Sequence, residues 1–201
     1  RSPDVAVITN VAPNHLDVHK DMQEYIDSKK NLYLHQNAFS RTVLNLDNDV
    51  TRSFATEVRG ELSFFSRREM PENGAFLDED GVLYAVHHGR KEALLKKDEI
   101  VIPGLHNVEN YLAAISAVDG EVEPEKIVKV ARTFGGVEHR IELVRVKDGV
   151  RFYNDSIASS PSRTIAGLRS FPEKVILIAG GYDKHIPYDV LGPEICAHVK
   201  K

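Results

Sequence analysis

The sequence has 201 residues, of which 42% are hydrophobic and 28% charged, a balance that can bury a core and keep a soluble surface. Its formal net charge of -4 supplies no broad basic field, so neither nucleic acid nor an anionic membrane is expected as the main partner. Cys196 is the only cysteine, which excludes an internal disulfide and fits a reducing compartment. No signal-peptide pattern or membrane-length apolar run occurs, so no membrane insertion is expected and the cytoplasm is the expected location.

The chain opens with a predicted strand, Val5 to Ile8, whose apolar residues are typical of a strand buried on both faces. A polar loop that contains a proline follows from Asn10 to His19, and loops at the carboxyl ends of such strands are where α/β proteins place ligands. Asp21 is suited to cap the next helix, with Glu24 three residues on. We predict that this helix extends from Met22 to Asn37.

Two adjacent lysines on this predicted helix are expected to have different environments. Apolar side chains recur along one stripe of the helix, at Met22, Tyr25, Ile26 and Tyr33. A step of about 100° per residue puts Lys29 within roughly 20° of the centre of the stripe and Lys30 roughly 80° away, at its edge. On helix geometry alone, Lys29 lays its alkyl chain on the core and keeps its ammonium in water.

Apolar strands and amphipathic helices continue to alternate along the chain, which predicts an α/β fold. The strings "TVLNLDND" and "ELSFFS" predict buried strands, and "GAFLDEDGVLYAV" predicts a hairpin with its turn at Asp80-Gly81. Helices are predicted at His106 to Val118 and at Pro124 to Phe134. Gly135-Gly136 then breaks the pattern, so we place a domain boundary at Gly136, between predicted domains 1–136 and 137–201.

Beyond this boundary the string "IELVRVKDGVRFYND" predicts a second hairpin with its turn at Asp148-Gly149. A helix near Ser162 to Ser170 and a buried strand at "KVILIAGG" follow. The second predicted domain is too short for a doubly wound domain of about 100 residues or more. The sequence also contains no G-x-x-x-x-G-K-[ST] phosphate loop. We therefore expect a piece of a longer protein that would not turn over ATP alone.

The string "NHLDVHKDMQEYIDSKK" resembles the signature of the Mur ligases, the ATP-dependent enzymes that add amino acids to the peptide of the bacterial cell-wall precursor. In this family the lysine fourteen residues after the histidine of "HLD" is carbamylated and supports magnesium near the γ-phosphate of ATP. That count leads from His15 to Lys29. The resemblance implies ATP and two Mg²⁺ ions as cofactors, with His15 a ligand of the second ion. A lysine in a partly apolar site loses its proton readily, as reaction with CO₂ requires, and a carbamate offers anionic oxygens to a hard cation.

A second motif is "GLHNVENYLAAISAV", in which Asn107 and Asn110 fall in the first turn of a predicted helix. Taken alone, Asn107 could cap the helix and Asn110 could be a solvated surface residue. The pattern is similar to the Mur ligase element whose asparagines contact the adenine ring. An amide side chain donates and accepts hydrogen bonds at once, which matches the edge of adenine.

Further motifs follow the predicted boundary. Taken alone, the arginine of "GGVEHRIE" would be solvated and "YNDSIASSPSRT" would supply ordinary turn and capping residues. The resemblance implies that Arg140 reaches ATP from the hinge, where guanidinium geometry suits phosphate. It also implies that Asp155 holds the ribose of ATP and that Ser159 contacts the incoming amino acid. Lys184, after "LIAGG", would bind the side-chain carboxylate of that amino acid.

The string "NDSIASSP" is most similar to the members of the family that add D-glutamate, although Ile157 stands where their commoner pattern has lysine. The implied partners are UDP-N-acetylmuramoyl-L-alanine and D-glutamate, and a monomer is expected. The implied fold is the latter part of a Mur ligase central ATP-binding domain, residues 1–136, and the start of a Rossmann-like, amino-acid-binding C-terminal domain, residues 137–201. Two alternatives stay open: another Mur ligase or a folylpolyglutamate synthetase, and a non-catalytic nucleotide-binding domain.

Overall fold

The computed structural model describes residues 1–12, 19–182 and 187–201. Two compact units are present, the first made of Arg1–Ile100 and Val108–Arg132, and the second of Val101–Asn107 and Thr133–Lys201. Packing thus divides the chain between Arg132 and Thr133 and assigns a short internal segment to the second unit. The boundary at Gly136, which separates two functional domains, stays a prediction.

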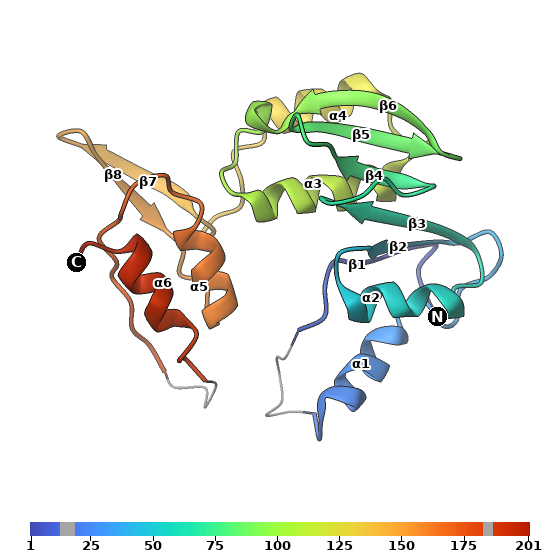
Figure 1. Ribbon diagram of the computed structural model, residues 1–201, viewed down its shortest axis with the longest axis horizontal. Helices are drawn as coiled ribbons and strands as arrows, with labels where there is room; N and C mark the ends of the chain where they lie inside the picture. Colours follow the sequence, from blue (N-terminus) through green and yellow to red (C-terminus); the bar gives the residue numbers. More distant parts are fainter. Residues whose placement is uncertain (13–18, 183–186) are drawn as a thin grey trace. The chain divides into compact units, whose positions relative to one another are not determined.

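The first unit contains a six-stranded sheet in the order β1-β2-β3-β4-β5-β6 (Figure 1). Its strands are β1 (Val5–Ile8), β2 (Arg41–Asn45), β3 (Glu61–Ser66), β4 (Gly74–Leu77), β5 (Val82–His87) and β6 (Arg90–Lys96). The first four are parallel neighbours, and β5 and β6 continue the sheet antiparallel. The predicted α/β class is therefore confirmed.

The junction of β3 and β4 needs no crossover helix, although the two strands are parallel. β4 pairs with only the last part of β3, in a register that begins with Phe64 opposite Gly74. Since the chain returns by only a short distance along the strand direction, a loop suffices where a full parallel connection would need a dozen residues or more.

Helices cover both faces of this sheet. On one face, α1 (Met22–Lys30), α2 (Asp49–Ser53) and the 3-10 turn η1 (Phe54–Glu57) enclose a core that includes Ala6, Ile8, Tyr25, Tyr33, Leu44 and Phe54. Arg41 points to the other face of β2, because side chains alternate along a strand. Its Nη1 donates to the carbonyl oxygen of Asp119 at 2.7 Å, just past α3 (Leu105–Val118), so α3 lies on that second face. The last helix of the unit is α4 (Pro124–Thr133).

The first helix begins as predicted but ends early. The backbone N–H of Glu24 donates to Asp21 Oδ1 at 2.9 Å, which confirms Asp21 as the cap. The predicted end at Asn37 is wrong, because α1 ends at Lys30. Gln36 explains the difference: its buried amide donates to the carbonyl oxygen of Pro3 at 2.8 Å and accepts from Thr42 Oγ1 at 2.6 Å. These bonds to the segments before β1 and within β2 hold the chain after Lys30 in turns.

Both predicted hairpins are confirmed. Gly81, with a φ of 77°, closes the turn between β4 and β5. Asp148 and Gly149, with φ values of 50° and 77°, form the turn between β7 (Glu142–Lys147) and β8 (Val150–Asn154). Two positive φ values in succession are what a two-residue hairpin requires. The sequence pattern does not predict β6, whose mostly exposed residues lack the alternation of a half-buried strand.

The second unit contains the two-stranded sheet β7-β8 and the helices α5 (Pro161–Leu168) and α6 (Leu191–His198). The helix predicted near Ser162 is thus confirmed, but the buried strand predicted at residues 174–181 is wrong. Ile176 and Ile178 are 63% and 96% exposed, and only Val175 forms a β-bridge, with Val199. An apolar strand is buried only where neighbouring strands and helices cover it, and among the described residues this segment has one bridge. No described helix is both long and apolar enough to cross a membrane.

Two arginine–glutamate pairs link elements within the units. Arg132 Nε on α4 donates to Glu99 Oε1 at 2.9 Å, and Arg169 Nε after α5 donates to Glu194 Oε2 on α6 at 2.9 Å. The pKa of each carboxyl lies below its usual value, but the main causes differ. The backbone N–H of Lys96 is the largest cause for Glu99, whereas Arg169 itself is the largest cause for Glu194.

We expect Arg169→Ala to return the pKa of Glu194 most of the way to its ordinary value. Arg132→Ala should leave the pKa of Glu99 clearly lowered, because the Lys96 N–H remains. Each carboxylate stabilises the fold above its unfolded pKa, and that contribution is lost as pH falls through the lower folded pKa. An NMR pH titration of the glutamate side chains measures both values. Equal upward shifts in the two variants would contradict this assignment of causes.

Candidate functional site

Two predicted site residues, His15 and Lys184, fall within residues 13–18 and 183–186 and lie outside the described residues. Their roles stay predictions. The residues just after β1 are held from the end of β2 and the start of α2. Asn45 Nδ2 donates to the carbonyl oxygen of Thr9 at 2.9 Å, and Asn48 Nδ2 donates to that of Val11 at 3.3 Å. These asparagines, in the string "TVLNLDND", were not predicted to have this role. They join the carboxyl ends of β1 and β2, the edge where parallel sheets bind ligands.

Lys29 lies on the Tyr25 side of α1, as helix periodicity predicts. Its Nζ is 5.1 Å from the centroid of the Tyr25 ring, and that ring is 5.3 Å from the imidazole of His19. A cation over an aromatic face gains a modest electrostatic attraction. Lys29 as a whole is nevertheless exposed.

Lys30 is the more enclosed of the two lysines, so the predicted contrast in burial is wrong. Its side chain is 19% exposed, its Nζ is 2.5 Å from Glu57 Oε1, and it lies 5.2 Å from the centroid of the Phe54 ring. Both partners belong to η1, which packs against the Lys30 side of the last turn of α1. Burial depends on this neighbouring element, which the helix angle alone does not reveal.

The two lysines differ instead in their partners. Within the part of the chain that the structure describes, Lys30 is held by a carboxylate and Lys29 has no ion-pair partner. Reaction with CO₂ needs the lone pair of the amine, and an amine in an ion pair must first leave that contact. The geometry therefore favours Lys29 over Lys30 for this chemistry.

The two predicted adenine-contacting residues have different surroundings on α3. The helix begins at Leu105, so Asn107 lies inside it and does not cap it. Asn107 is 6% exposed, and its Nδ2 donates to the carbonyl oxygen of Pro103 at 2.6 Å. Asn110, one turn further on, is exposed. Of the two asparagines, Asn110 is thus the one that lies at the surface of the helix.

Asp155 occupies a half-buried position at the end of β8. The backbone N–H of Ile141 donates to its Oδ1 at 3.1 Å. Burial raises the pKa of the Asp155 carboxyl above its ordinary value, while that hydrogen bond and the positive charges of His106 and Arg140 oppose the rise. A carboxylate can accept about four hydrogen bonds, so Asp155 retains acceptor capacity among the described residues. This capacity fits the hydroxyls of a ribose.

The backbone brings Arg140, Asp155 and Ser159 into one region of the second unit. His139 connects the "HR" and "ND" motifs, because its Nδ1 lies 2.8 Å from Asn154 Nδ2 and its carbonyl oxygen accepts from the N–H of Ile157 at 3.3 Å. Ser159 and Arg140 are exposed. The sequence motifs predict no role for His139, although it lies beside Arg140 in the string "GGVEHRIE".

Gly167 on α5 is a second residue of this region that sequence reasoning missed. A β-carbon at this position would lie 2.7 Å from Asp155 Oδ2, so the glycine lets the helix approach the carboxylate. No motif marked it, since a glycine inside a helix carries no signal of what lies against it. Two other predicted site residues, Lys29 and Asn110, belong to the first unit and not to this region.

No group of three or more His, Cys, Asp or Glu side chains is placed to hold a metal ion among residues 1–12, 19–182 and 187–201. Lys29 is exposed and has no ion-pair partner within those same ranges, so its amine is accessible for the predicted reaction with CO₂.

Comparison with known proteins defines the class. The sequence profile of the Mur ligase middle domain matches residues 1–118, and the chain belongs to the Mur ligase family. The predicted resemblance is thereby confirmed. Over 200 residues the chain is 60% identical to the UDP-N-acetylmuramoylalanine--D-glutamate ligase of Acetivibrio thermocellus, an alignment that covers 100% of this chain and 43% of that ligase. The chain thus spans less than half the length of this relative.

Solved structures agree on the fold. MurF from Acinetobacter baumannii superimposes with a TM-score of 0.65 at 21% identity, over 84% of this chain and 37% of that chain. The MurF ligase of Thermotoga maritima, solved in complex with ADP, gives a TM-score of 0.61 at 21% identity, over 86% of this chain and 40% of that chain. At such identities the likeness establishes the Mur ligase fold alone.

Proposed function

We propose that this sequence belongs to an ATP-dependent ligase that adds D-glutamate to UDP-N-acetylmuramoyl-L-alanine during synthesis of the peptidoglycan precursor. The observation that carries the proposal is the 60% identity to a D-glutamate ligase along the whole chain. The motif "NDSIASSP" lies within that match, and its resemblance to the D-glutamate-adding members of the family supports this choice of amino acid. The ligase is proposed to act as a monomer in the cytoplasm, where Cys196 would stay reduced.

The nucleotide would be held by residues of several motifs. Asn110 would contact the adenine, while Asn107, through its bond to Pro103, would hold the first turn of α3. Asp155 would accept hydrogen bonds from the ribose, and Arg140 would contact phosphate. The ADP bound to the Thermotoga maritima MurF supports a nucleotide in this fold.

The proposed reaction has two steps. The terminal phosphoryl group of ATP passes to the alanyl carboxylate, which forms an acyl phosphate and releases ADP. The amine of D-glutamate then attacks the acyl carbon, the amide bond forms, phosphate leaves and the amine loses a proton. Most catalysis of the first step would be positioning and neutralisation of charge on the phosphates.

Two Mg²⁺ ions, when bound, would neutralise part of that charge, with His15 and a carbamylated Lys29 as their proposed contacts. Ser159 would hydrogen-bond the incoming D-glutamate, and Lys184 would pair with its side-chain carboxylate. Ile157 is an apolar residue that is 41% exposed, so this position supplies no cation. Any cationic contact there must come from another residue.

The test is amino-acid choice in the full-length ligase that carries this sequence. With ATP and UDP-N-acetylmuramoyl-L-alanine present, we expect D-glutamate to drive phosphate release and to yield a product heavier by one glutamyl residue. L-glutamate, glycine and L-lysine are the matched controls and should give only background release. Activity with one of these but not with D-glutamate would identify a different ligase. ATP binding without turnover of any amino acid would favour a non-catalytic domain.

A further inference from the structure

An ion pair with no role in the proposed mechanism ties α3 to the sheet. Arg67, just after β3, donates from Nε to Glu109 Oε1 at 2.6 Å. The two side chains are 28% and 27% exposed, so water screens the pair only in part. A charge-assisted bond of this kind is stronger than one between neutral groups. Glu109 directly precedes Asn110 in α3.

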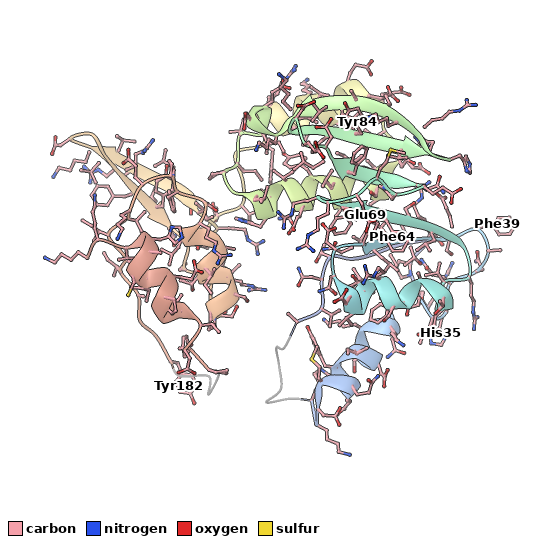
Figure 2. The ribbon with its side chains drawn as sticks, viewed as in Figure 1. His35, Phe39, Phe64, Glu69, Tyr84 and Tyr182 are labelled. Atoms are coloured by element: carbon pink, nitrogen blue, oxygen red, sulfur yellow. The ribbon has the colours of Figure 1, made fainter. Side chains whose placement is uncertain are left out.

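The backbone around Arg67 is itself held rigidly. Asp47 accepts the N–H of Arg67 at Oδ2 (2.8 Å) and the hydroxyl of Ser66 at Oδ1 (2.7 Å). The Ser66 oxygen in turn accepts the N–H groups of Arg68 at 2.9 Å and Glu69 at 3.0 Å. Figure 2 labels Glu69 in this loop and Phe64 on the preceding strand. The arginine therefore projects from a fixed loop, which makes it suited to fix its partner.

The rest of α3 within the first unit is secured independently. Leu112 and Ile115 are 0% and 1% exposed, and Arg41 Nη1 holds the chain past the end of the helix through the Asp119 carbonyl oxygen at 2.7 Å. Loss of the Arg67 contact would leave these anchors in place. The effect should be confined to the turn that carries Asn110.

We propose that Arg67 and Glu109 are positioning residues that hold Asn110 at the orientation needed to recognise adenine, and that they thereby set the preference for ATP over other nucleoside triphosphates. The proposal rests on the ATP-dependent function proposed above. An amide recognises adenine only when its donor and acceptor both align with the base, and hydrogen bonds weaken steeply with angle. A small rotation of one helical turn would therefore weaken base recognition.

The experiment compares the full-length ligase with its Arg67→Ala, Glu109→Ala, double and Arg67→Lys variants, in steady-state kinetics with ATP and with GTP. We expect each alanine variant to raise the KM for ATP about tenfold, the effect of losing about one hydrogen bond between Asn110 and the base. The kcat and the KM for D-glutamate should change little, and the preference for ATP over GTP should fall. The double variant should be no worse than either single one, and Arg67→Lys should recover part of the loss.

Arg68→Ala is the matched control, because the adjacent Arg68 guanidinium has no partner among the described residues and should leave the KM for ATP unchanged. An unchanged KM for ATP in Arg67→Ala would overturn the proposal. A lower kcat, a higher KM for every substrate and a lower unfolding temperature, found together, would also overturn it, because a purely structural role predicts that combination.

Calorimetric titration with ATP separates this proposal from the proposed function. If the unaltered ligase ignores D-glutamate but Arg67→Ala still weakens ATP binding, the function fails and the positioning role stands. Should Arg67→Ala fail to fold, Arg67→Lys and Glu109→Gln take its place. ATP affinity equal to that of the unaltered ligase in both would overturn the role.

Discussion

Lys29→Ala is expected to abolish most activity of the full-length ligase, whereas Lys30→Ala is expected to retain it. Under the proposed mechanism only Lys29 carries the carbamate that acts beside the phosphates, and removal of such a charge-stabilising group typically costs about 100-fold or more in kcat. Lys30 instead pairs with Glu57 through a partly exposed contact, and such pairs contribute about 0–1 kcal/mol to stability. Initial rates at saturating substrates measure the contrast.

Two controls sharpen this comparison. Excess bicarbonate should not rescue Lys29→Ala, because an alanine offers no amine to react, and it should leave the activity of Lys30→Ala unchanged. NMR of ligase incubated with ¹³C-bicarbonate should show a carbamate signal that Lys29→Ala lacks and Lys30→Ala keeps. Equal loss of activity in the two variants, or a carbamate signal that persists in Lys29→Ala, would remove Lys29 from the proposed mechanism.

Gly74→Ala is expected to destabilise the first unit strongly. Gly74 has a φ of 124°, and a β-carbon there would lie 1.9 Å from the carbonyl oxygen of Phe64. That oxygen belongs to the backbone of β3, in the register that pairs Phe64 with Gly74, so it cannot move without breaking the strand pairing. We expect a loss of about 3 kcal/mol or more and a drop of about 10 °C in unfolding temperature.

Gly120→Ala is the matched control, because Gly120 also has a positive φ, 73°, but no described atom lies within 4 Å of the position that a β-carbon would take there. It should cost only the backbone strain, about 1 kcal/mol. Thermal and urea unfolding followed by circular dichroism give both values. Similar losses in the two variants would mean that backbone angle, rather than the close approach to Phe64, determines the requirement for glycine at position 74.

Local chemistry predicted much of this fold because it acts within a few residues. Asp21 caps α1, and the positive φ values of Gly81 and of Asp148 with Gly149 close the hairpins as their turn positions require. None of these features depends on distant parts of the chain. The motif strings work in the same way, since residues close in sequence stay close in space, and they led to the family that the comparison confirms.

The site was predicted less completely, because its surroundings come from far along the chain. The burial of Lys30 is due to Phe54 and Glu57. The raised pKa of Asp155 arises from its burial, and the Ile141 N–H together with the charges of His106 and Arg140 opposes that rise. The place of Gly167 against Asp155 depends on how α5 packs. The hydrophobic periodicity of a sequence does not predict which element will cover a given side chain.

The amino-acid sequence by itself determined most of the strands and helices, the turn residues and the family motifs, since these follow from short-range backbone and hydrogen-bond preferences. Only the tertiary structure decided where α1 ends, which of two adjacent lysines is enclosed, and that Arg67 reaches Glu109. These outcomes result from contacts between residues tens of positions apart, and their energies exist only once the chain has folded.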